Sequence, residues 1–292
     1  MLDAGHDVAL VLTQPDRPAG RGLRSSASAV SQLAAARGLA LFQPQTLKDD
    51  GVLDRLAAAR PEVLVVAAYG LIVPPRALEV APHGAINIHA SLLPRWRGAA
   101  PIQHALLAGD RETGITIMKM NAGLDTGPML SLHRLAIAAD DDAQTLHDRL
   151  AALGAEAVVN ALADIAAGRA KPLPQPESGA IYARKIGNDD AELDWARPCV
   201  ALERAVRALR PSPGARSQLR GETFKFWRAR CIARDGMPGE VLESSAEGIL
   251  IACGEGALLV TELQRAGGKR LATADFLRGF PLTRGERFGA AR

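Results

Sequence analysis

The stretch that decides the fold is His83-Gly-Ala-Ile-Asn-Ile-His-Ala-Ser-Leu-Leu-Pro-Arg-Trp-Arg-Gly98. Within it, Ile86 and Ile88 alternate with Asn87 and His89, and this period of two predicts a strand with one apolar and one polar face. Asn87 and His89 therefore point the same way, about 7 Å apart, where the strand runs out into a loop.

A second polar loop, Asn121-Ala-Gly-Leu-Asp-Thr-Gly127, carries the carboxylate of Asp125. An asparagine amide can donate a hydrogen bond to a developing oxyanion. A histidine paired with an aspartate can move a proton, because the aspartate fixes the tautomer and charge of the ring. Asn87, His89 and Asp125 are therefore candidate catalytic residues of a group-transfer site that needs no covalent intermediate.

Two other kinds of site are disfavoured by residue spacing. The histidines show no H-E-x-x-H spacing and the cysteines lie elsewhere in the chain, so we expect no metal. Ser91 lacks the G-x-S-x-G turn that presents a serine nucleophile.

Length and composition predict a two-domain protein of the cytoplasm. The 292 residues exceed the usual size of one domain. No run of eighteen apolar residues could cross a membrane, and residues 1–7 lack the layout of a secretory signal. The three cysteines are widely spaced and indicate reduced thiols. No feature demands an oligomer, so we expect a monomer.

Charge is distributed unevenly along the chain. From residue 200 onward there are sixteen Lys and Arg against ten Asp and Glu, whereas the preceding residues hold nineteen against twenty-two. A basic C-terminal part joined to a slightly acidic N-terminal part suggests chemistry in one and a polyanion in the other. A chain that is rich in arginine throughout would show a similar surplus of positive charge. The charge distribution alone therefore does not decide whether the protein binds nucleic acid.

Strands alternate with helices over the first 170 residues. Strands are predicted at residues 7–13, 39–42, 62–68, 86–89, 115–120 and 129–132, the first of them buried. Helices are predicted at 29–37, 53–59, 75–80, 101–108 and 142–168, the last either continuous or broken at Gly154. This alternation predicts an α/β fold with a Rossmann-like, doubly wound, mainly parallel sheet in residues 1–170.

A proline-rich linker at residues 171–187 precedes a different pattern. A helix at 199–209 has Leu202 and Val206 on one face and arginines on the other. Short strands follow at 224–230, 240–242, 248–253 and 257–263, and Thr273 is the predicted N-cap of a helix at 273–277. Short strands with glycine turns predict a small all-β barrel or sandwich in residues 188–292.

Residues 15–24 form a turn-rich loop with three arginines, Arg17, Arg21 and Arg24. No Gly-Lys-Ser/Thr follows, so the loop is not a P-loop. It is either a solvated surface loop or an arginine loop that grips phosphates.

The two polar segments closely resemble those of the 10-formyltetrahydrofolate-dependent formyltransferases. That superfamily shares Asn87-Ile-His89-Ala-Ser-Leu-Leu-Pro94 and the distal Asp125. The continuation Arg95-Trp-Arg-Gly-Ala-Ala-Pro-Ile102 and the arginine loop are most similar to the methionyl-tRNA formyltransferases within it, as are Ala67-Ala-Tyr-Gly-Leu-Ile72 and Leu193-Asp-Trp195.

The resemblance implies formyl transfer from 10-formyltetrahydrofolate, used as a co-substrate without a metal, to the α-amine of methionyl initiator tRNA. Asn87 and His89 would stabilise the tetrahedral oxyanion, and Asp125 would hold His89 and help to remove the amine proton. The folate pocket would be lined by Tyr69, Ser91, Leu92, Leu93 and Pro94.

The resemblance also implies that the C-terminal domain is an OB-fold that binds tRNA, with Arg204 and Arg207 on its basic helix. The loop arginines Arg17, Arg21 and Arg24 would reach the acceptor end.

Members of the family begin with a further strand, loop and helix, which the stretch before residue 7 lacks. We therefore expect that Met1 is an internal methionine of a longer natural protein. Two alternatives remain: a formyltransferase acting on a sugar or purine-precursor amine, and a non-catalytic RNA-binding protein.

Overall fold

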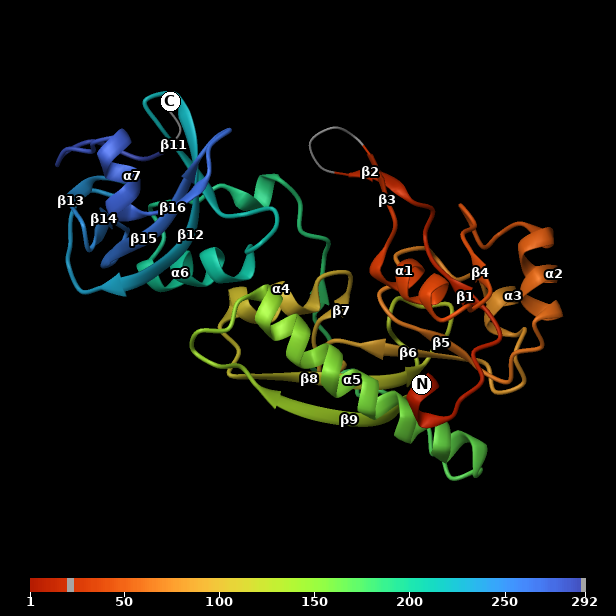
Figure 1. Cartoon of the computed structure of the whole chain (residues 1–292). Helices are drawn as coiled ribbons and strands as arrows, with labels where there is room; N and C mark the ends of the chain where they lie inside the picture. Colours follow the sequence, from red (N-terminus) through yellow and green to blue (C-terminus); the bar gives the residue numbers. More distant parts are fainter. Residues whose placement is uncertain (20–23, 290–292) are drawn as a thin grey trace. The chain divides into compact units, whose positions relative to one another are not determined.

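The computed structural model describes residues 1–19 and 24–289 (Figure 1). They form two compact units. The first comprises Met1–Ala99, Gly114–Leu135 and Leu150–Tyr182, and the second comprises Ala100–Thr113, Ala136–Arg149 and Ala183–Arg292. The predicted domains, residues 1–170 and 188–292 with a linker at 171–187, are each continuous in the chain. Each compact unit instead combines three separate segments, so the predicted division stays a prediction.

Helices and strands alternate along the N-terminal part, as predicted (Figure 1). The strands are β1 (Val11–Leu12), β2 (Arg17–Ala19), β3 (Arg24–Ser26), β4 (Leu41–Phe42), β5 (Leu64–Val66), β6 (Ala85–His89), β7 (Arg97–Gly98), β8 (Glu112–Lys119) and β9 (Met129–Ala136). The helices are η1 (Leu2–Ala4), α1 (Ala29–Ala36), α2 (Asp50–Ala58), α3 (Pro75–Leu78), α4 (Pro101–Ala108) and α5 (Ala143–Ala166).

The strand with the polar face lies inside a four-stranded sheet of order β5-β6-β8-β9. β5 runs parallel to β6, with Val66 opposite Asn87, and β8 runs antiparallel to it, with Thr116 opposite His89. β1 and β4 pair in parallel as a separate two-stranded sheet. The predicted α/β architecture with parallel pairing is confirmed, and the β6–β8 pair is antiparallel.

Helix α5 covers one face of this sheet (Figure 1) and is continuous, so the alternative of a break at Gly154 is wrong. A Cβ atom at Gly154 would lie 2.9 Å from Cγ2 of Ile88. Glycine therefore lets the helix approach the back of the strand that carries Asn87 and His89, and packing overrides its weak helix propensity.

The first predicted strand is shorter and less buried than expected. Only Val11 and Leu12 of residues 7–13 are in a strand, and both are half-buried. A small apolar cluster is formed by buried residues of α2 and α3. Packed against it, and only partly buried, are Leu10, Leu12 and Leu64. The prediction of a buried strand here is therefore wrong.

An antiparallel sheet dominates the second unit, in the order β11-β12-β15-β14-β13 with β16 paired to β15. Its elements are α6 (Cys199–Ala208), β11 (Arg216–Leu219), β12 (Glu222–Ile232), β13 (Val241–Ser245), β14 (Gly248–Ala252), β15 (Ala257–Arg265), β16 (Arg270–Ala272) and α7 (Thr273–Gly279), preceded by the short β10 (Tyr182–Ala183) and η2 (Asp189–Ala191). The apolar core includes Phe224, Phe226, Leu202 and Phe276. An antiparallel β domain is thus confirmed.

The predicted N-cap of the last helix is wrong. Ala272 occupies that position, and Thr273 is the first helical residue. The Thr273 hydroxyl is buried and donates to the carbonyl of Val260 at 2.9 Å, so it ties the helix to β15 instead of capping it. Among the helices of the described chain, none is long and apolar enough to cross a membrane.

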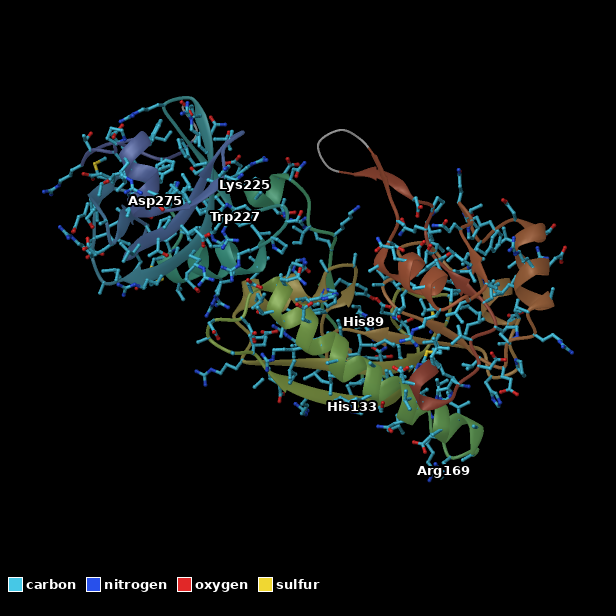
Figure 2. All side chains as sticks on the ribbon, in the orientation of Figure 1. His89, His133, Arg169, Lys225, Trp227 and Asp275 are labelled. Atoms are coloured by element: carbon cyan, nitrogen blue, oxygen red, sulfur yellow. The ribbon has the colours of Figure 1, made fainter. Side chains whose placement is uncertain are left out.

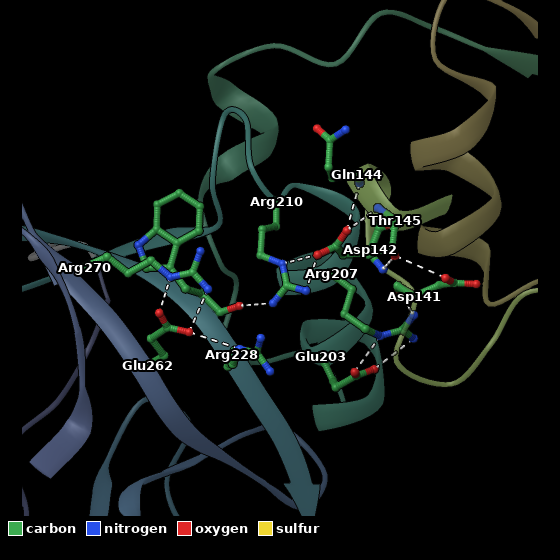
Figure 3. A network of polar contacts seen from close by, with 11 residues as sticks. Asp141, Asp142, Gln144, Thr145, Glu203, Arg207, Arg210, Arg228, Glu262 and Arg270 are labelled. Carbon is green, nitrogen blue, oxygen red and sulfur yellow. Dashed lines mark hydrogen bonds and ion pairs between the residues drawn. The ribbon is translucent and has the colours of Figure 1, made fainter. Parts of the chain in front are cut away.

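A polar network joins the start of α5 to α6 within the second unit (Figure 3). The Asp142 carboxylate accepts from the backbone N–H groups of Gln144 and Thr145 and pairs with Arg210. Burial alone would raise the pKa of Asp142, but the Thr145 amide and the Arg210 guanidinium together hold it below its usual value. Arg210 also donates to the Trp227 carbonyl at 2.8 Å.

Replacing Asp142 by alanine should lower the free energy of unfolding by about 3 kcal/mol, because it removes the helix cap and leaves the largely buried Arg210 without its partner. Asp142→Asn keeps an acceptor for the cap and should lose less. Since the folded pKa is depressed, the carboxylate stabilises the fold above its unfolded pKa of about 3.9. That stabilisation is lost as the pH falls through the folded pKa.

Urea unfolding at neutral pH and at pH about 2 measures both effects. The exposed neighbour Asp140 provides the control variant, Asp140→Ala. Equal stabilities of Asp142→Ala and Asp140→Ala at neutral pH would contradict the role of the network.

Candidate active site

Asn87 and His89 lie on one face at the carboxyl end of β6, as predicted, and both are buried. His89 is labelled in Figure 2. The parallel register of Val66 with Asn87 makes β5 and β6 end at the same edge of the sheet. Ligands bind at this edge in open α/β sheets. The segment after β5, which carries Tyr69, and the segment after β6 therefore leave the sheet side by side.

The structure brings Asp125 to these two residues. Asn87 Nδ2 lies 3.4 Å from Asp125 Oδ1, and His89 Nδ1 lies 3.6 Å from Asp125 Oδ2. The second distance is too long for a hydrogen bond but is within ion-pair range. Catalytic contacts are often long before substrate binds. The three predicted catalytic residues thus form one cluster, although 38 positions separate Asn87 from Asp125.

The contacts of the His89 ring define where it can carry a proton. Nε2 lies 2.9 Å from the carbonyl oxygen of Trp96, which can only accept, so Nε2 carries a hydrogen. Nδ1 faces the Asp125 carboxylate, another acceptor. Nδ1 is therefore the ring atom through which His89 and Asp125 face each other.

The Asp125 carboxylate is held by the backbone of the other loop. The N–H of Gly98 donates to Asp125 Oδ2 at 2.8 Å. Asp125 itself has a φ of 51°, in the left-handed region that aspartate tolerates better than most residues. The carboxylate lies toward β6, beside Asn87 and His89.

Tyr69 follows β5 in a tightly turned segment, with Ala68 and Gly70 at positive φ on either side. Its carbonyl accepts from Gln14 Nε2 at 2.8 Å. Its hydroxyl oxygen is buried and has no hydrogen-bond partner in the part of the chain that the structure describes. Burial raises the pKa of the Tyr69 hydroxyl, so the group stays neutral at physiological pH.

The residues predicted to line a folate pocket after β6 differ in exposure. Ser91 and Leu93 are buried: Ser91 Oγ donates to the carbonyl of Arg95 at 2.6 Å, and Leu93 N–H donates to Thr116 Oγ1 at 3.1 Å. Leu92 and Pro94 are half-buried. Ser91 and Leu93 therefore stabilise the loop, whereas Leu92 and Pro94 keep part of their side-chain surface accessible.

Two arginines of the predicted loop, Arg17 and Arg24, lie in two paired strands. Arg17 begins β2 and Arg24 begins β3, and the two strands pair antiparallel with Ala19 opposite Arg24. Arg21 lies outside the described residues. Contact of these three with tRNA stays a prediction.

The two arginines predicted on α6 have partners inside the second unit, and Figure 3 shows those of Arg207. Arg207 pairs with Glu203 and donates to the carbonyl of Asp141 at 2.8 Å. Arg204 lies against the backbone of Gly109 and reaches the carbonyl of Ala108 at 3.4 Å. Their binding to tRNA also stays a prediction.

The residue pattern could not reveal the backbone groups that complete the site. The Gly98 N–H and the Trp96 carbonyl act through main-chain atoms, so no side-chain pattern marks them. Within residues 1–19 and 24–289, no cluster of three His, Cys, Asp or Glu has the arrangement of a metal site.

The chain is similar to known proteins over most of its length. Residues 2–162 match the formyl transferase family model, and residues 185–281 match that of the formyl transferase C-terminal domain. The chain is 54% identical to a methionyl-tRNA formyltransferase of Aromatoleum aromaticum, covering 100% of this chain and 92% of that protein. It is 55% identical to one of Dechloromonas aromatica, covering 99% and 93%.

A solved structure shares the fold at much lower identity. HypX from Aquifex aeolicus, in complex with tetrahydrofolic acid, superposes with a TM-score of 0.62 and 20% identity, over 88% of this chain and 47% of that one. With two family models spanning most of its length and relatives more than half identical throughout, the chain belongs to the formyl transferase family.

Proposed function

We propose that the protein transfers a formyl group from 10-formyltetrahydrofolate to the α-amine of methionine on initiator tRNA, giving N-formylmethionyl-tRNA. The cluster of Asn87, His89 and Asp125 carries this proposal, in a chain 54% identical to a methionyl-tRNA formyltransferase. The protein acts as a monomer in the cytoplasm, where translation supplies its acceptor.

The reaction forms a bond between the formyl carbon and the methionine nitrogen and breaks the bond from that carbon to the folate nitrogen N10. The donor supplies an activated formyl group. The attacking amine loses a proton, and N10 gains one. The residues of the chain must therefore stabilise charge on the formyl oxygen and move a proton between two nitrogens.

Asn87 and His89 are the proposed donors to the formyl oxygen. One hydrogen of the Asn87 amide is turned toward Asp125, and the other can donate to a ligand at the end of β6. Both side chains are buried, so a developing negative charge would be stabilised more strongly than in water.

Asp125 is the proposed proton acceptor, acting directly or through Nδ1 of His89. Its carboxylate is already fixed by the Gly98 N–H, so it needs little reorganisation during the reaction. The same group orients the His89 ring from one side while the Trp96 carbonyl orients it from the other.

The buried hydroxyl of Tyr69 supports the proposed folate site. An unpaired buried hydroxyl is costly unless a ligand or water completes it, and a pteridine ring offers polar atoms that could do so. Leu92 and Pro94 would contact the ring, whereas Ser91 and Leu93 would support the loop from within.

The acceptor tRNA would be held through its phosphates. Arg17, Arg21 and Arg24 would contribute from the arginine loop, and Arg204 and Arg207 from the basic C-terminal part, an OB-fold in this proposal. The contribution of Arg207 would be reduced, because Glu203 already neutralises its charge.

Asn87→Ala should lower kcat for formylation roughly 10²–10³-fold, as expected for removal of one oxyanion donor. Binding of methionyl-tRNA should stay within about twofold of the unsubstituted protein, because Asn87 is buried and carries no charge. Steady-state formylation with 10-formyltetrahydrofolate and a filter-binding titration with tRNA measure the two quantities. Full turnover by Asn87→Ala would remove Asn87 from the mechanism.

His89→Ala should behave in the same way, and His83→Ala is its matched control. His83 is exposed and precedes the same strand, so its replacement should leave turnover unchanged. A similar loss of turnover in both variants would mean that the strand, and not the His89 ring, is what the substitutions disturb.

Arg21→Ala should weaken tRNA binding and reduce the slope of log K against log salt by about 0.7–0.9 for each phosphate that the arginine neutralises. Arg76→Ala is the control, because Arg76 is exposed and paired with Asp50. An unchanged slope for Arg21→Ala would remove the loop from the tRNA interface and reopen a smaller amine as acceptor.

A further inference from the structure

One residue of the proline-rich segment differs from its neighbours. Among residues 171–179, all of which the structure describes, Gln175 alone is half-buried and the others are exposed. It stands between two prolines, Pro174 and Pro176, which restrict the backbone on both sides. The contacts of this polar side chain explain why it turns inward from an exposed segment.

The Gln175 amide makes four hydrogen bonds. Its Oε1 accepts from Nε of Arg97 at 2.9 Å and from Nη2 of Arg97 at 2.7 Å. Its Nε2 donates to the carbonyl of Asp125 at 2.8 Å and to the carbonyl of Gly127 at 2.8 Å. Two donors and two acceptor positions are the full capacity of an amide.

The chemistry of the partners dictates which way the amide points. The Arg97 guanidinium can only donate, so it must face the oxygen. The two backbone carbonyls can only accept, so they must face the nitrogen. The orientation is therefore fixed by the partners and does not depend on how an amide is assigned.

These partners are the two segments that hold the catalytic carboxylate. Arg97 is followed by Gly98, whose N–H donates to Asp125 Oδ2. On the other side, Gln175 holds the carbonyl of Asp125 itself, at a residue with positive φ. One side chain thus sets the spacing between the Gly98 amide and the Asp125 loop.

We propose that Gln175 is a positioning residue for Asp125, and this rests on the proposed formyl transfer. It does not touch substrate. It clamps the Asp125 loop to the Arg97 segment, so that the carboxylate meets Asn87 and His89 at the distances the chemistry needs. Misplacement of a reacting group by about 1 Å can cost roughly 10²-fold in rate.

Two variants of similar size separate the two halves of the clamp. Gln175→Leu removes all four hydrogen bonds. Gln175→Glu keeps acceptors for Arg97 but sets a carboxylate oxygen against the carbonyls of Asp125 and Gly127. Both should lower kcat roughly 10–100-fold and leave the KM for methionyl-tRNA within about twofold. Gln218→Leu and Gln218→Glu, at an exposed glutamine of β11, are the matched controls.

A double-mutant cycle tests whether Gln175 acts through Asp125. In an Asp125→Asn background, Gln175→Leu should cost less than about twofold in kcat, because the carboxylate it positions is gone. If the double variant loses kcat by the full product of the two single losses, the proposal is overturned. An unchanged kcat in both Gln175 variants would overturn it as well.

Hydrogen exchange of peptides spanning residues 120–128 separates this proposal from the proposed function. Gln175→Leu should speed exchange there, with far-UV circular dichroism unchanged, whether or not the protein formylates methionyl-tRNA. If the unsubstituted protein is inactive and the loop still loosens, the proposed function fails and the clamp stands. If exchange is unchanged, the clamp is overturned even when turnover falls.

Discussion

The hydrogen bond from the Gly98 N–H to the Asp125 carboxylate is the interaction on which the site depends. It joins the segment after β6 to the loop after β8, and it turns the carboxylate toward Asn87 and His89. Without it, a charged side chain 16% exposed would keep two long contacts with described side chains, at 3.4 Å to Asn87 and 3.6 Å to His89. The positive φ of Asp125 and the two carbonyl contacts of Gln175 support the same geometry from the backbone side.

The sheet and the loop after β8 together explain why this hydrogen bond can form. β6 lies between a parallel and an antiparallel neighbour, so its polar face ends at the edge where β5 also ends and β8 begins. The loop after β8 leaves from the opposite edge, and Asp125 within it lies beside Asn87 and His89 of β6. Helix α5 lies close behind it because position 154 has no side chain. A rigid strand then presents Asn87 and His89, and a loop fixed by main-chain contacts presents Asp125. Sites whose groups are fixed beforehand reorganise little during the reaction.

Periodicity predicted the elements whose packing follows their own sequence. The alternation of Ile86 and Ile88 with polar residues placed Asn87 and His89 correctly, and Pro101 and Gly109 bracket α4 as expected. Tertiary contacts decided the rest. Gly154 does not break α5, because Ile88 packs against it. Thr273 does not cap α7, because its hydroxyl donates to Val260. Residues 7–13 have the composition of a buried strand, yet only two of them pair and neither is buried.

Much of the site could not be predicted from the residue pattern, for a different reason. Two of its parts, the Gly98 amide and the Trp96 carbonyl, are main-chain groups that nearly every residue type carries. Gln175 lies in a proline-rich segment that lacks periodicity, so it was part of the predicted linker. Gln175 differs from its exposed neighbours only in being half-buried, and this difference appears only once the burial of each residue is known.

The most direct test of the central claim is a formylation assay of the purified chain with 10-formyltetrahydrofolate and methionyl-tRNA. The proposed chemistry predicts N-formylmethionyl-tRNA, with turnover that depends on both substrates. Absence of product from folded protein, or formylation of a sugar or purine-precursor amine in preference to methionyl-tRNA, would contradict it.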